Sequence, residues 1–391
     1  MLRVVGTPAR VVSAVLVVVA LSAQVWVLVT RGSFNLRRLA SDDPRAHVDF
    51  DSFHRSAQAL LRGADIYDTA AVLPNLNPPL LTVVLAPLGA LGAQAAYRVL
   101  LLVTVVLVLG CVLVVAREVR LPAPDTGLAV AAVLLSGPLL ATLGLGQIYA
   151  LLTVTLTASW LAQRRGMPVV AGVALGAAAA LKPSLAPLLL LPVLRRSWRT
   201  AAAAGLTAVL GTGVGVLVAG SSASLTWVGL VLDNPVQTYV DNASLPATMV
   251  RLTSDTGYGQ PLVELPGGAV VGAVAGAVVL VATLWLARGP SEYGLWAVAA
   301  ASLVASPVTW HTYLVVLVPG MVLVLVRSRV LAAPLLALLL IGQEWPGLVL
   351  GEDGAGSALP VSLYAGVLLA YWAAFLACAR DVVRPRVASS P

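Results

Sequence analysis

The sequence predicts an all-α, polytopic membrane protein with about twelve transmembrane helices. Of its 391 residues, 59% are hydrophobic and 10% are charged, and the mean hydropathy is +0.94. Soluble globular chains carry about 25% charged residues. Apolar runs close to the bilayer-spanning length of about 20 residues recur from one end of the chain to the other. Residues 1–391 are therefore expected to form one integral membrane domain without a separate soluble domain.

Basic residues lie singly or in pairs where the apolar runs end, which is the pattern that sets membrane topology. Arg3 and Arg10 precede the first run, so the N-terminus is expected in the cytoplasm. A weak cleavage-like sequence at residues 20–23 lies inside this run, which we interpret as an uncleaved helix. Both termini are then predicted inside. The predicted spans are residues 11–30, 98–116, 126–145, 148–163, 167–181, 184–194, 200–219, 267–287, 291–306, 312–326, 330–343 and 361–379.

Two long segments are predicted to be external loops, residues 31–97 and 220–266. Within the first, the spacing of apolar residues over 47–68 indicates an amphipathic helix lying at the membrane interface. Residues 78–97 are apolar but interrupted by proline and glycine, which predicts a re-entrant or broken element. A short acidic loop is also predicted outside, and it contains Glu344, Glu352 and Asp353.

The unusual polar residues gather on the predicted outer side, which favours a functional site there. Asp49 and Asp51 begin the amphipathic helix, and their side chains diverge by about 200°, so only one can enter a given site. Capping of the helix dipole is the alternative role for either carboxylate. Asp65 and Asp68 follow Gly63, where a turn favours solvated or capping roles.

Lys182 follows fourteen uncharged residues, 168–181, and precedes another apolar run. An ammonium group in such a place needs a partner, and a phosphate is the partner we expect. Snorkelling of the side chain to the outer interface is the alternative.

Further candidates have weaker patterns. Asn77 precedes two prolines at a predicted helix start. Gln147 follows the run 126–145, where it caps a helix or bonds a sugar hydroxyl. Trp310 is either an interfacial belt residue or a platform on which a sugar stacks. The remaining candidates lie in the loops after 200–219 and 291–306, and they are Asn242, Ser244, Arg251 and His311.

Other chemistries are not expected. The chain has three histidines, so a histidine-based metal site is not predicted, and neither is a cofactor. Cys111 and Cys378 lie in apolar runs and are expected to be buried thiols. The glycines of 211–215 lie inside an apolar span with no preceding strand, which indicates helix packing and not a nucleotide loop. The excess of basic residues is topology charge, so nucleic-acid binding is not expected.

Taken in order, these motifs resemble the polyprenyl-phosphate-sugar-dependent glycosyltransferases of the C superfamily. The chain is most similar to the actinobacterial α-mannosyl- and arabinofuranosyltransferases of family 87. Tyr149 departs from the pattern, because family members commonly have asparagine there. The matching elements span roughly residues 45–315 and are Asp49 with Phe53, Gly63 and Tyr67, Asn77-Pro78-Pro79, Gly146-Gln147, Ala180-Leu181-Lys182-Pro183, Asn242-Ala-Ser244 with Arg251, and Ser306-Pro307 with Trp310-His311.

The resemblance implies that a sugar, with mannose as the favoured one, passes with inversion from a polyprenyl-phosphate donor to a glycolipid or cell-envelope glycan acceptor. It implies a multi-pass protein of the cell membrane, in contact with membrane lipids, whose active site faces the extracytoplasmic side. Asp49 would be the general base, with Asp51 as a lesser candidate. The implied donor-phosphate ligands are Lys182, Arg251 and His311, and the implied substrate-binding residues are Asn77, Gln147, Asn242, Ser244 and Trp310.

Three alternatives stay open. An arabinofuranosyltransferase would use polyprenyl-phospho-arabinose as its donor. A lipid-linked sugar flippase or other transporter would distribute polar residues through the bundle midplane, and four predicted spans are almost free of them: 98–116, 200–219, 267–287 and 361–379. An inactive lipid-binding scaffold would be indifferent to replacement of Asp49.

The predicted topology is testable with single cysteine substitutions and an impermeant thiol reagent. Because basic residues cluster in alternate loops, we expect positions 196 and 329 to be cytoplasmic and position 353 to be external. Intact cells should therefore be labelled at Asp353→Cys and not at Arg196→Cys or Arg329→Cys. Labelling of position 196 without position 353 would overturn the topology.

Overall fold

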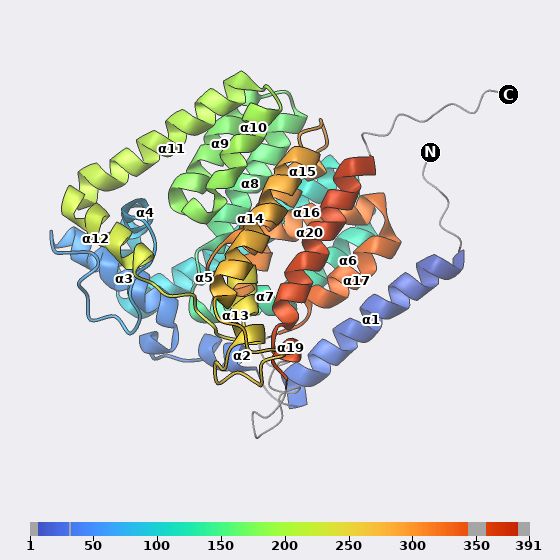
Figure 1. Cartoon of the computed structure of the whole chain (residues 1–391), viewed down its shortest axis with the longest axis horizontal. Coiled ribbons are helices and arrows are strands. Elements are labelled where there is room, and N and C mark those ends of the chain that lie inside the picture. Colours follow the sequence, from blue (N-terminus) through green and yellow to red (C-terminus); the bar gives the residue numbers. More distant parts are fainter. Residues whose placement is uncertain (1–6, 31–32, 343–356, 382–391) are drawn as a thin grey trace.

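The chain folds into a bundle of helices (Figure 1). The structure, a computed structural model, describes residues 7–30, 33–342 and 357–381. Within these ranges the only β-structure is two isolated bridges, Asn242 with Trp310 and Gln260 with Ser357. The predicted acidic loop with Glu344, Glu352 and Asp353 lies outside the described residues, as does Arg3. The all-α class predicted from the sequence is confirmed.

Most helices follow one another with short connections, and the longest connections among the described residues, 62–78, 233–244 and 254–267, fall within the two predicted external segments or end at their edge. The N-terminal helices are α1 (Thr7–Thr30), α2 (Phe34–Leu39), η1 (Pro44–Ala46), α3 (Val48–Leu61), α4 (Pro79–Gly89), α5 (Ala93–Glu118), α6 (Ala123–Leu134), α7 (Gly137–Leu145), α8 (Tyr149–Arg164), α9 (Pro168–Leu181), η2 (Pro183–Leu189) and α10 (Leu190–Leu194). The C-terminal helices are α11 (Trp198–Ala219), α12 (Ser221–Leu232), α13 (Leu245–Thr253), α14 (Gly268–Leu286), α15 (Tyr293–Ala305), η3 (His311–Tyr313), α16 (Leu314–Arg327), α17 (Arg329–Leu339), α19 (Ala358–Val361) and α20 (Leu363–Asp381).

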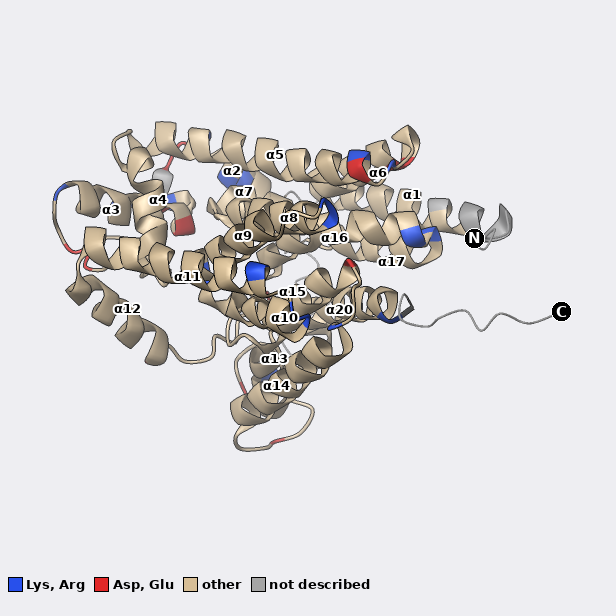
Figure 2. Cartoon of the chain, turned by 90° about the horizontal axis from the view of Figure 1, so that it is seen from above, with Lys and Arg blue, Asp and Glu red and all other residues tan. Residues whose placement is uncertain are grey.

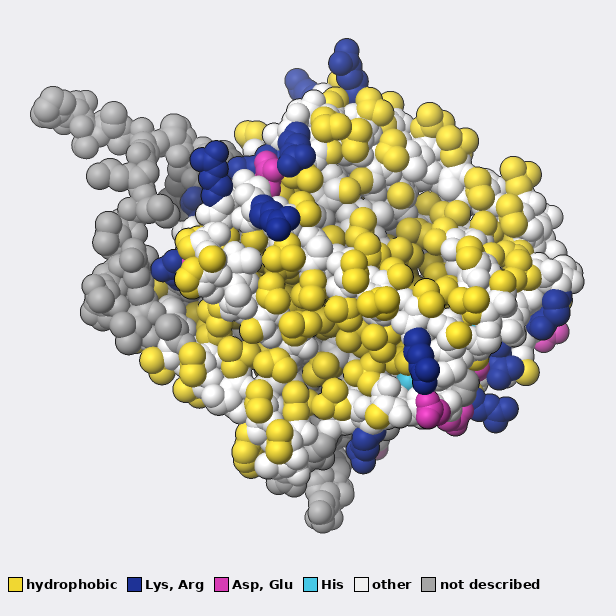
Figure 3. Space-filling model, turned by 180° about the vertical axis from the view of Figure 1, so that it is seen from behind, with side chains coloured by type: hydrophobic (Ala, Val, Ile, Leu, Met, Phe, Trp, Pro, Cys, Tyr) yellow, Lys and Arg dark blue, Asp and Glu magenta, His cyan; other side chains and the backbone are white. Residues whose placement is uncertain are grey.

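The bundle has the composition of a membrane protein. Four helices are long and apolar enough to cross a bilayer, α5, α11, α14 and α20, and α6 with α7 form a fifth candidate that is bent by 46°. Several further apolar helices are shorter than 18 residues. Charged side chains are sparse along the helices (Figure 2), and hydrophobic side chains cover the middle of one face with basic groups above and below (Figure 3). The polytopic membrane class is confirmed, while twelve crossings remain a prediction.

The core lies around α15 and α16, which pack against α20 and α8. The residues of α15 from Tyr293 to Val304 are all buried, including the large side chain of Trp296. Near this core, α9 and α11 approach closely, because a side chain at Gly172 or Gly176 would overlap the backbone of α11. Small residues at such positions let two membrane helices come into backbone contact. This contact fixes the end of α9, where Lys182 follows.

Helix boundaries agree with the predicted spans to within a few residues, with three differences. The span 126–145 is divided into α6 and α7, because Ser136 caps a new helix through its Oγ, which accepts the Leu139 N–H at 3.2 Å. The region 78–97 is divided into α4 and the first turns of α5. The region 220–266, predicted as a loop, contains α12 and α13.

The predicted amphipathic helix is present as α3, but it ends at Leu61, two residues before Gly63, which has a positive φ of 68°. The helix packs against α4 and is largely buried. Its polar side chains hold the following loop, since Ser52 Oγ donates to the Leu73 carbonyl at 2.6 Å and Ser56 Oγ to the Ile66 carbonyl at 2.7 Å. Residues 62–78 therefore cover part of a helix that the sequence predicts to lie at the membrane interface.

Candidate active site

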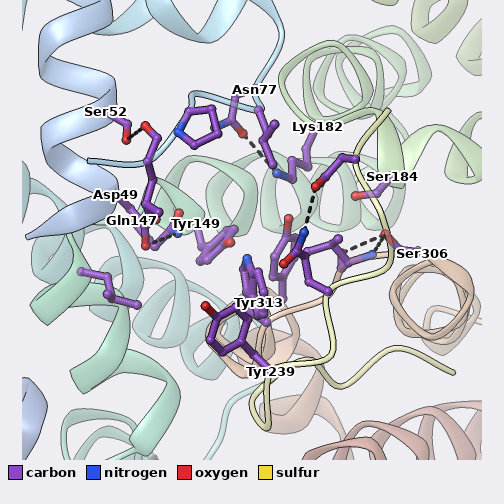
Figure 4. Close-up of a pocket in the computed structure, with 18 of the residues that line it drawn as sticks. Asp49, Ser52, Asn77, Gln147, Tyr149, Lys182, Ser184, Tyr239, Ser306 and Tyr313 are labelled. Carbon is purple, nitrogen blue, oxygen red and sulfur yellow. Dashed lines mark hydrogen bonds between the residues drawn. The ribbon is translucent and has the colours of Figure 1, made fainter. Parts of the chain in front are cut away.

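A cavity of about 980 Å³ opens where segments distant in the sequence meet (Figure 4). This volume is typical of a site for a small molecule or a lipid headgroup. The polar and aromatic side chains that line it come from α2, α3, the loop before α4, the α7–α8 junction, the α9–η2 junction, α12, the loops after α12 and α15, η3 and α20. They are Arg38, Asp49, Ser52, Phe53, Asn77, Gln147, Tyr149, Lys182, Ser184, Trp227, Asn234, Gln237, Tyr239, Asp241, Ser306, Trp310, Tyr313 and Tyr364.

Asp49 lies in the first turn of α3 and faces the cavity. Gln147 Nε2 donates to Asp49 Oδ2 at 2.8 Å. Burial raises the pKa of Asp49 to about 6, against the opposing effects of the Gln147 hydrogen bond and the positive charge of Arg38. Burial has this effect because it disfavours the charged form. A carboxylate with this pKa is ionised at neutral pH and is a stronger base than an ordinary one.

Gln147 reaches Asp49 because α7 ends in a tight cap. Gly146 has a φ of 73°, in the left-handed region, and the Gln147 N–H donates to the Thr142 carbonyl at 2.8 Å. A side chain at position 146 would overlap Phe50 of α3. The glycine therefore allows α3 and the end of α7 to touch, and this contact brings the Gln147 amide beside the carboxylate.

Lys182 lies at the junction of α9 and η2, on a different part of the cavity wall from Asp49. Its Nζ donates to Asn77 Oδ1 at 3.1 Å and lies 5.4 Å from the centre of the Tyr313 ring. Among the described residues, no carboxylate oxygen lies within 4.0 Å of this ammonium group. Its neighbours are thus a neutral amide and an aromatic face, which leaves its charge available to an anion.

Asn77 is held for this contact by the loop before α4. Its side-chain Nδ2 donates to Asn75 Oδ1 at 3.2 Å, which leaves Oδ1 to accept from Lys182. Tyr67 Oη donates to the backbone carbonyl of Asn77 at 2.7 Å. On the same side, Trp227 of α12 donates from Nε1 to the Leu76 carbonyl at 3.1 Å. The helix α12 thereby closes the cavity with its inner face, while Leu225 and Leu232 on the helix are exposed.

Arg38 is a cavity residue that sequence reasoning did not single out. Burial lowers the pKa of its guanidinium, and the negative charges of Asp49 and Asp241 act in the opposite direction. Both carboxylates are therefore within electrostatic range of this cation. The signal in the sequence was an arginine pair, Arg37-Arg38, on the side of the membrane where the positive-inside rule expects few basic residues.

Two tyrosines form the aromatic part of the wall, and their ring centres lie 4.2 Å apart. Tyr313 ends η3 immediately before α16 and lies near Lys182, and Tyr149 begins α8 next to the α7 cap. Tyr149 is the residue at which the chain departs from the motif that it otherwise resembles. The ring fills space beside Asp49 and is buried, with 2% of its surface exposed.

Asp51 lies outside the cavity lining, as its position in the helix requires. Its Oδ1 pairs with Arg55 Nε at 2.7 Å, and its Oδ2 accepts the Val72 N–H at 3.4 Å. The carboxylate thus ties the loop 62–78 to α3. Its catalytic role, already the lesser hypothesis, has no support from this geometry.

Arg251 also lies outside the cavity. Its side chain is 0% exposed, and its guanidinium donates to the backbone carbonyls of Tyr239 at 2.8 Å and Asn242 at 2.9 Å. Burial lowers the pKa of Arg251 to about 10, so it remains charged at neutral pH. The geometry makes it a support for the loop before α13 and gives it no access to a donor phosphate in this structure.

Asn242 and Ser244 join that loop to the segment after α15. Asn242 Oδ1 accepts the N–H groups of Ser244 at 3.1 Å and Thr309 at 3.0 Å. Ser244 Oγ donates to the Pro307 carbonyl at 3.2 Å. Both side chains are buried behind the cavity wall, and neither lines it.

His311 is 0% exposed and lies behind the same wall. Its Nδ1 is 3.8 Å from Asp241 Oδ2, and its ring lies 4.9 Å from that of Tyr364. The structure therefore divides the predicted site residues into two groups. Those that line the cavity are Asp49, Asn77, Gln147, Lys182 and Trp310, and those that lie outside it are Asp51, Asn242, Ser244, Arg251 and His311.

A helical membrane bundle with a cavity that holds a carboxylate and an uncompensated cation has the parts of a group-transfer enzyme. The chain belongs to glycosyltransferase family 87, whose model matches residues 75–307, more than half of the sequence. It is thus a membrane glycosyltransferase, as the motifs suggested.

One similar solved structure is ArnT from Cupriavidus metallidurans, bound to undecaprenyl phosphate. It is 18% identical in sequence, and the match covers 92% of this chain and 78% of that one with a TM-score of 0.36. No curated protein matches the chain.

The pKa of Asp49 leads to a prediction about pH. Below a pH of about 6 the carboxyl is protonated and cannot accept a proton, so kcat/KM for transfer should rise with pH and level off above that value. Gln147→Leu removes a hydrogen bond that stabilises the ionised form and should move this rise to higher pH. Asp51→Asn is the control and should leave its position unchanged. A Gln147→Leu profile that overlays the wild-type profile would show that Asp49 is not the titrating group.

Proposed function

We propose that the chain transfers a sugar, mannose in the version we favour, from a polyprenyl-phosphate donor to a glycolipid or cell-envelope glycan. The single observation that carries this proposal is that the Asp49 carboxylate and the Lys182 ammonium line the same cavity. A base and a cation on separate walls of one site are what displacement of a phosphate by a hydroxyl requires. The membrane location of the bundle suits a donor whose carrier is a lipid.

In this mechanism Asp49 is the general base. Gln147 occupies Oδ2 of the carboxylate, and Oδ1 accepts the proton of the acceptor hydroxyl. The hydroxyl oxygen forms a bond to the anomeric carbon while the bond from that carbon to the phosphate oxygen breaks. The electron pair leaves with the lipid phosphate, and the configuration inverts. A positioned base of this kind contributes roughly 10²–10⁴-fold to the rate.

Lys182 stabilises the departing phosphate. The phosphate gains negative charge as its bond to the sugar breaks, and a charge-assisted hydrogen bond from an ammonium group strengthens at that point. Asn77 and Tyr313 hold the Lys182 side chain without neutralising it. Apolar residues line the same cavity, and they offer a surface to the first carbons of a lipid chain: Val48, Phe53, Leu73, Leu76 and Val231.

The proposed site faces the extracytoplasmic side. The helix α8 begins at the cavity with Tyr149 and ends at Arg164 and Arg165, which pair with Glu292 and Glu118 at 2.8 and 2.7 Å. The helix α9 then returns to the cavity at Lys182. Because basic residues mark the cytoplasmic end of membrane helices, the opposite end of this pair is expected outside.

The experiment that tests the function incubates membranes containing the protein with radiolabelled polyprenyl-phospho-mannose or, separately, polyprenyl-phospho-arabinose. We expect label from the mannose donor to enter a lipid or glycan whose structure then identifies the acceptor. Label only from the arabinose donor would make the chain an arabinofuranosyltransferase. Transfer from neither donor, compared with membranes lacking the protein, would contradict the proposal and favour a flippase or an inactive scaffold.

Asp49→Asn should abolish transfer. The amide keeps the size of the side chain and its contact with Gln147, but it cannot take up the proton. We expect kcat to fall by at least about 10²-fold while donor binding survives. Asp51→Asn is the matched variant and should retain transfer. Retained turnover in Asp49→Asn together with loss in Asp51→Asn would assign the base to Asp51.

Two cation variants should separate binding from stability. Lys182→Met removes the ammonium group from the cavity and should lower kcat/KM for the donor about 10–100-fold, since charged hydrogen bonds are worth about 1.5–3 kcal/mol. Its melting temperature should stay close to that of the wild type. Arg251→Met leaves several buried carbonyls without donors and should instead lower the melting temperature.

Steady-state kinetics and thermal unfolding in detergent measure both effects. Wild-type donor kinetics in Lys182→Met would remove this residue from the site. Wild-type stability with weakened donor use in Arg251→Met would restore Arg251 as a phosphate ligand.

A further inference from the structure

The cavity has a second carboxylate that the mechanism does not use, that of Asp241. It belongs to the loop between α12 and α13 and lines the cavity. The side chain is 20% exposed, and its Oδ2 lies 3.8 Å from Nδ1 of the buried His311. An ionised carboxylate has about four acceptor sites on its two oxygens, so it can accept from ligand hydroxyls in addition to its partners within the protein.

Backbone contacts fix the position of Asp241. The His311 N–H donates to the Asp241 carbonyl at 2.8 Å, and the Ala243 N–H donates to the Thr309 carbonyl at 2.6 Å. Between these two bonds, Asn242 forms an isolated antiparallel bridge with Trp310. The loop that carries Asp241 and the segment that carries Trp310 are thus held together as a short two-stranded unit.

Aromatic rings stand beside this carboxylate. Trp310 lines the cavity, and its ring centre lies 6.2 Å from that of Tyr239 in an edge-on arrangement. Tyr239 is 54% exposed, which places it at the rim of the cavity (Figure 4). An aromatic face packs against the C–H side of a sugar ring, and a carboxylate accepts from its hydroxyls. The combination on one wall suits a sugar.

The position of Asp241 favours the acceptor sugar over the donor sugar. In an inverting displacement the attacking hydroxyl and the leaving phosphate lie on opposite sides of the anomeric carbon. The phosphate is assigned to Lys182, so the acceptor ring must extend from Asp49 away from Lys182. Arg38 lies within electrostatic range of both Asp49 and Asp241. Asp241 belongs to the unit that carries Trp310, which is separate from the α9–η2 junction that carries Lys182, so this unit is the part of the wall left for the acceptor ring.

We propose that Asp241 and Trp310 form the subsite that binds the ring of the acceptor sugar, with Tyr239 at its entrance. The Asp241 carboxylate accepts hydrogen bonds from ring hydroxyls that do not react, and Trp310 covers one face of the ring. Asp241 is then a specificity-determining residue and does not take the proton in the transfer. This inference rests on the proposed glycosyltransfer and assigns its acceptor site.

The test uses the full-length protein in detergent, with the donor that the wild type accepts, and two probe acceptors. These are octyl α-D-mannopyranoside and octyl α-D-arabinofuranoside. For the glycoside that is elongated, the monodeoxy analogues are measured as well. The variants are Asp241→Asn and Trp310→Leu, and the control is Asp233→Asn, an exposed carboxylate of the same loop that does not line the cavity.

We expect Asp241→Asn and Trp310→Leu to raise the acceptor KM at least about tenfold and to leave the donor KM within about twofold of the wild type. The wild type should discriminate at least about tenfold against one deoxy analogue that retains the reacting hydroxyl. Asp241→Asn should lose this discrimination, which a merely structural effect of the substitution would not produce. Asp233→Asn should behave as the wild type.

Three results would overturn the inference. One is a donor KM that rises as much as the acceptor KM in Asp241→Asn, which would place the donor sugar there. Another is discrimination among deoxy analogues that is unchanged in this variant. The third is a wild type that elongates extracted membrane lipids but neither octyl glycoside. Failure of the proposed function is distinct, because the wild type would then transfer from neither donor to any acceptor.

Discussion

The hydrogen bond from Gln147 to Asp49 is the contact on which the rest of the site depends. A carboxylate placed in an apolar cavity is destabilised in its charged form, and without a donor its pKa would be raised further. The Gln147 amide and the Arg38 charge limit that effect, so the pKa rises only to about 6. The bond in turn requires α3 to touch the end of α7, which Gly146 alone permits through its positive φ and missing side chain.

The motif residues of the sequence serve two purposes that the sequence does not distinguish. One group presents polar atoms to the cavity, and the other holds the wall in place from behind. Arg251 illustrates the second group, because its guanidinium donates hydrogen bonds to backbone carbonyls of the loop that carries Tyr239 and Asp241. A buried cation used in this way costs free energy unless its donors are satisfied, and here backbone carbonyls satisfy them. Substitution of such a residue impairs a site that it never touches.

Much of the fold could be predicted because local composition determines which segments insert into a membrane. Apolar runs that end in arginine pairs predicted the positions of most helices. Proline and glycine residues predicted the break within 78–97. Helical geometry alone also predicted that only one of Asp49 and Asp51 faces the site. The break at Ser136 was missed, since its short polar cap interrupts an otherwise continuous apolar run.

The direction of long side chains could not be predicted. Lys182 and Arg251 are both cations beside predicted outer loops, yet one faces the cavity and the other faces carbonyls behind it. Whether a cation faces the cavity or the carbonyls behind it depends on where distant segments place hydrogen-bond acceptors. Arg38 joined the site for the same reason, because only the folded chain brings it near Asp49 and Asp241. No local sequence pattern predicts such contacts between distant segments.

The helix α12 has a consequence for how a lipid-borne substrate is handled. It is a single helix between the cavity, which Trp227 and Val231 line, and an outer surface on which Leu225 and Leu232 are exposed. Removing a long hydrocarbon from a bilayer costs about 0.8 kcal/mol for each methylene group. In the proposed reaction, a wall one helix thick would keep such removal small, because only the headgroup and the first carbons of the tail would have to enter the cavity beside Lys182. The carrier of the proposed donor would then remain anchored in the membrane throughout turnover.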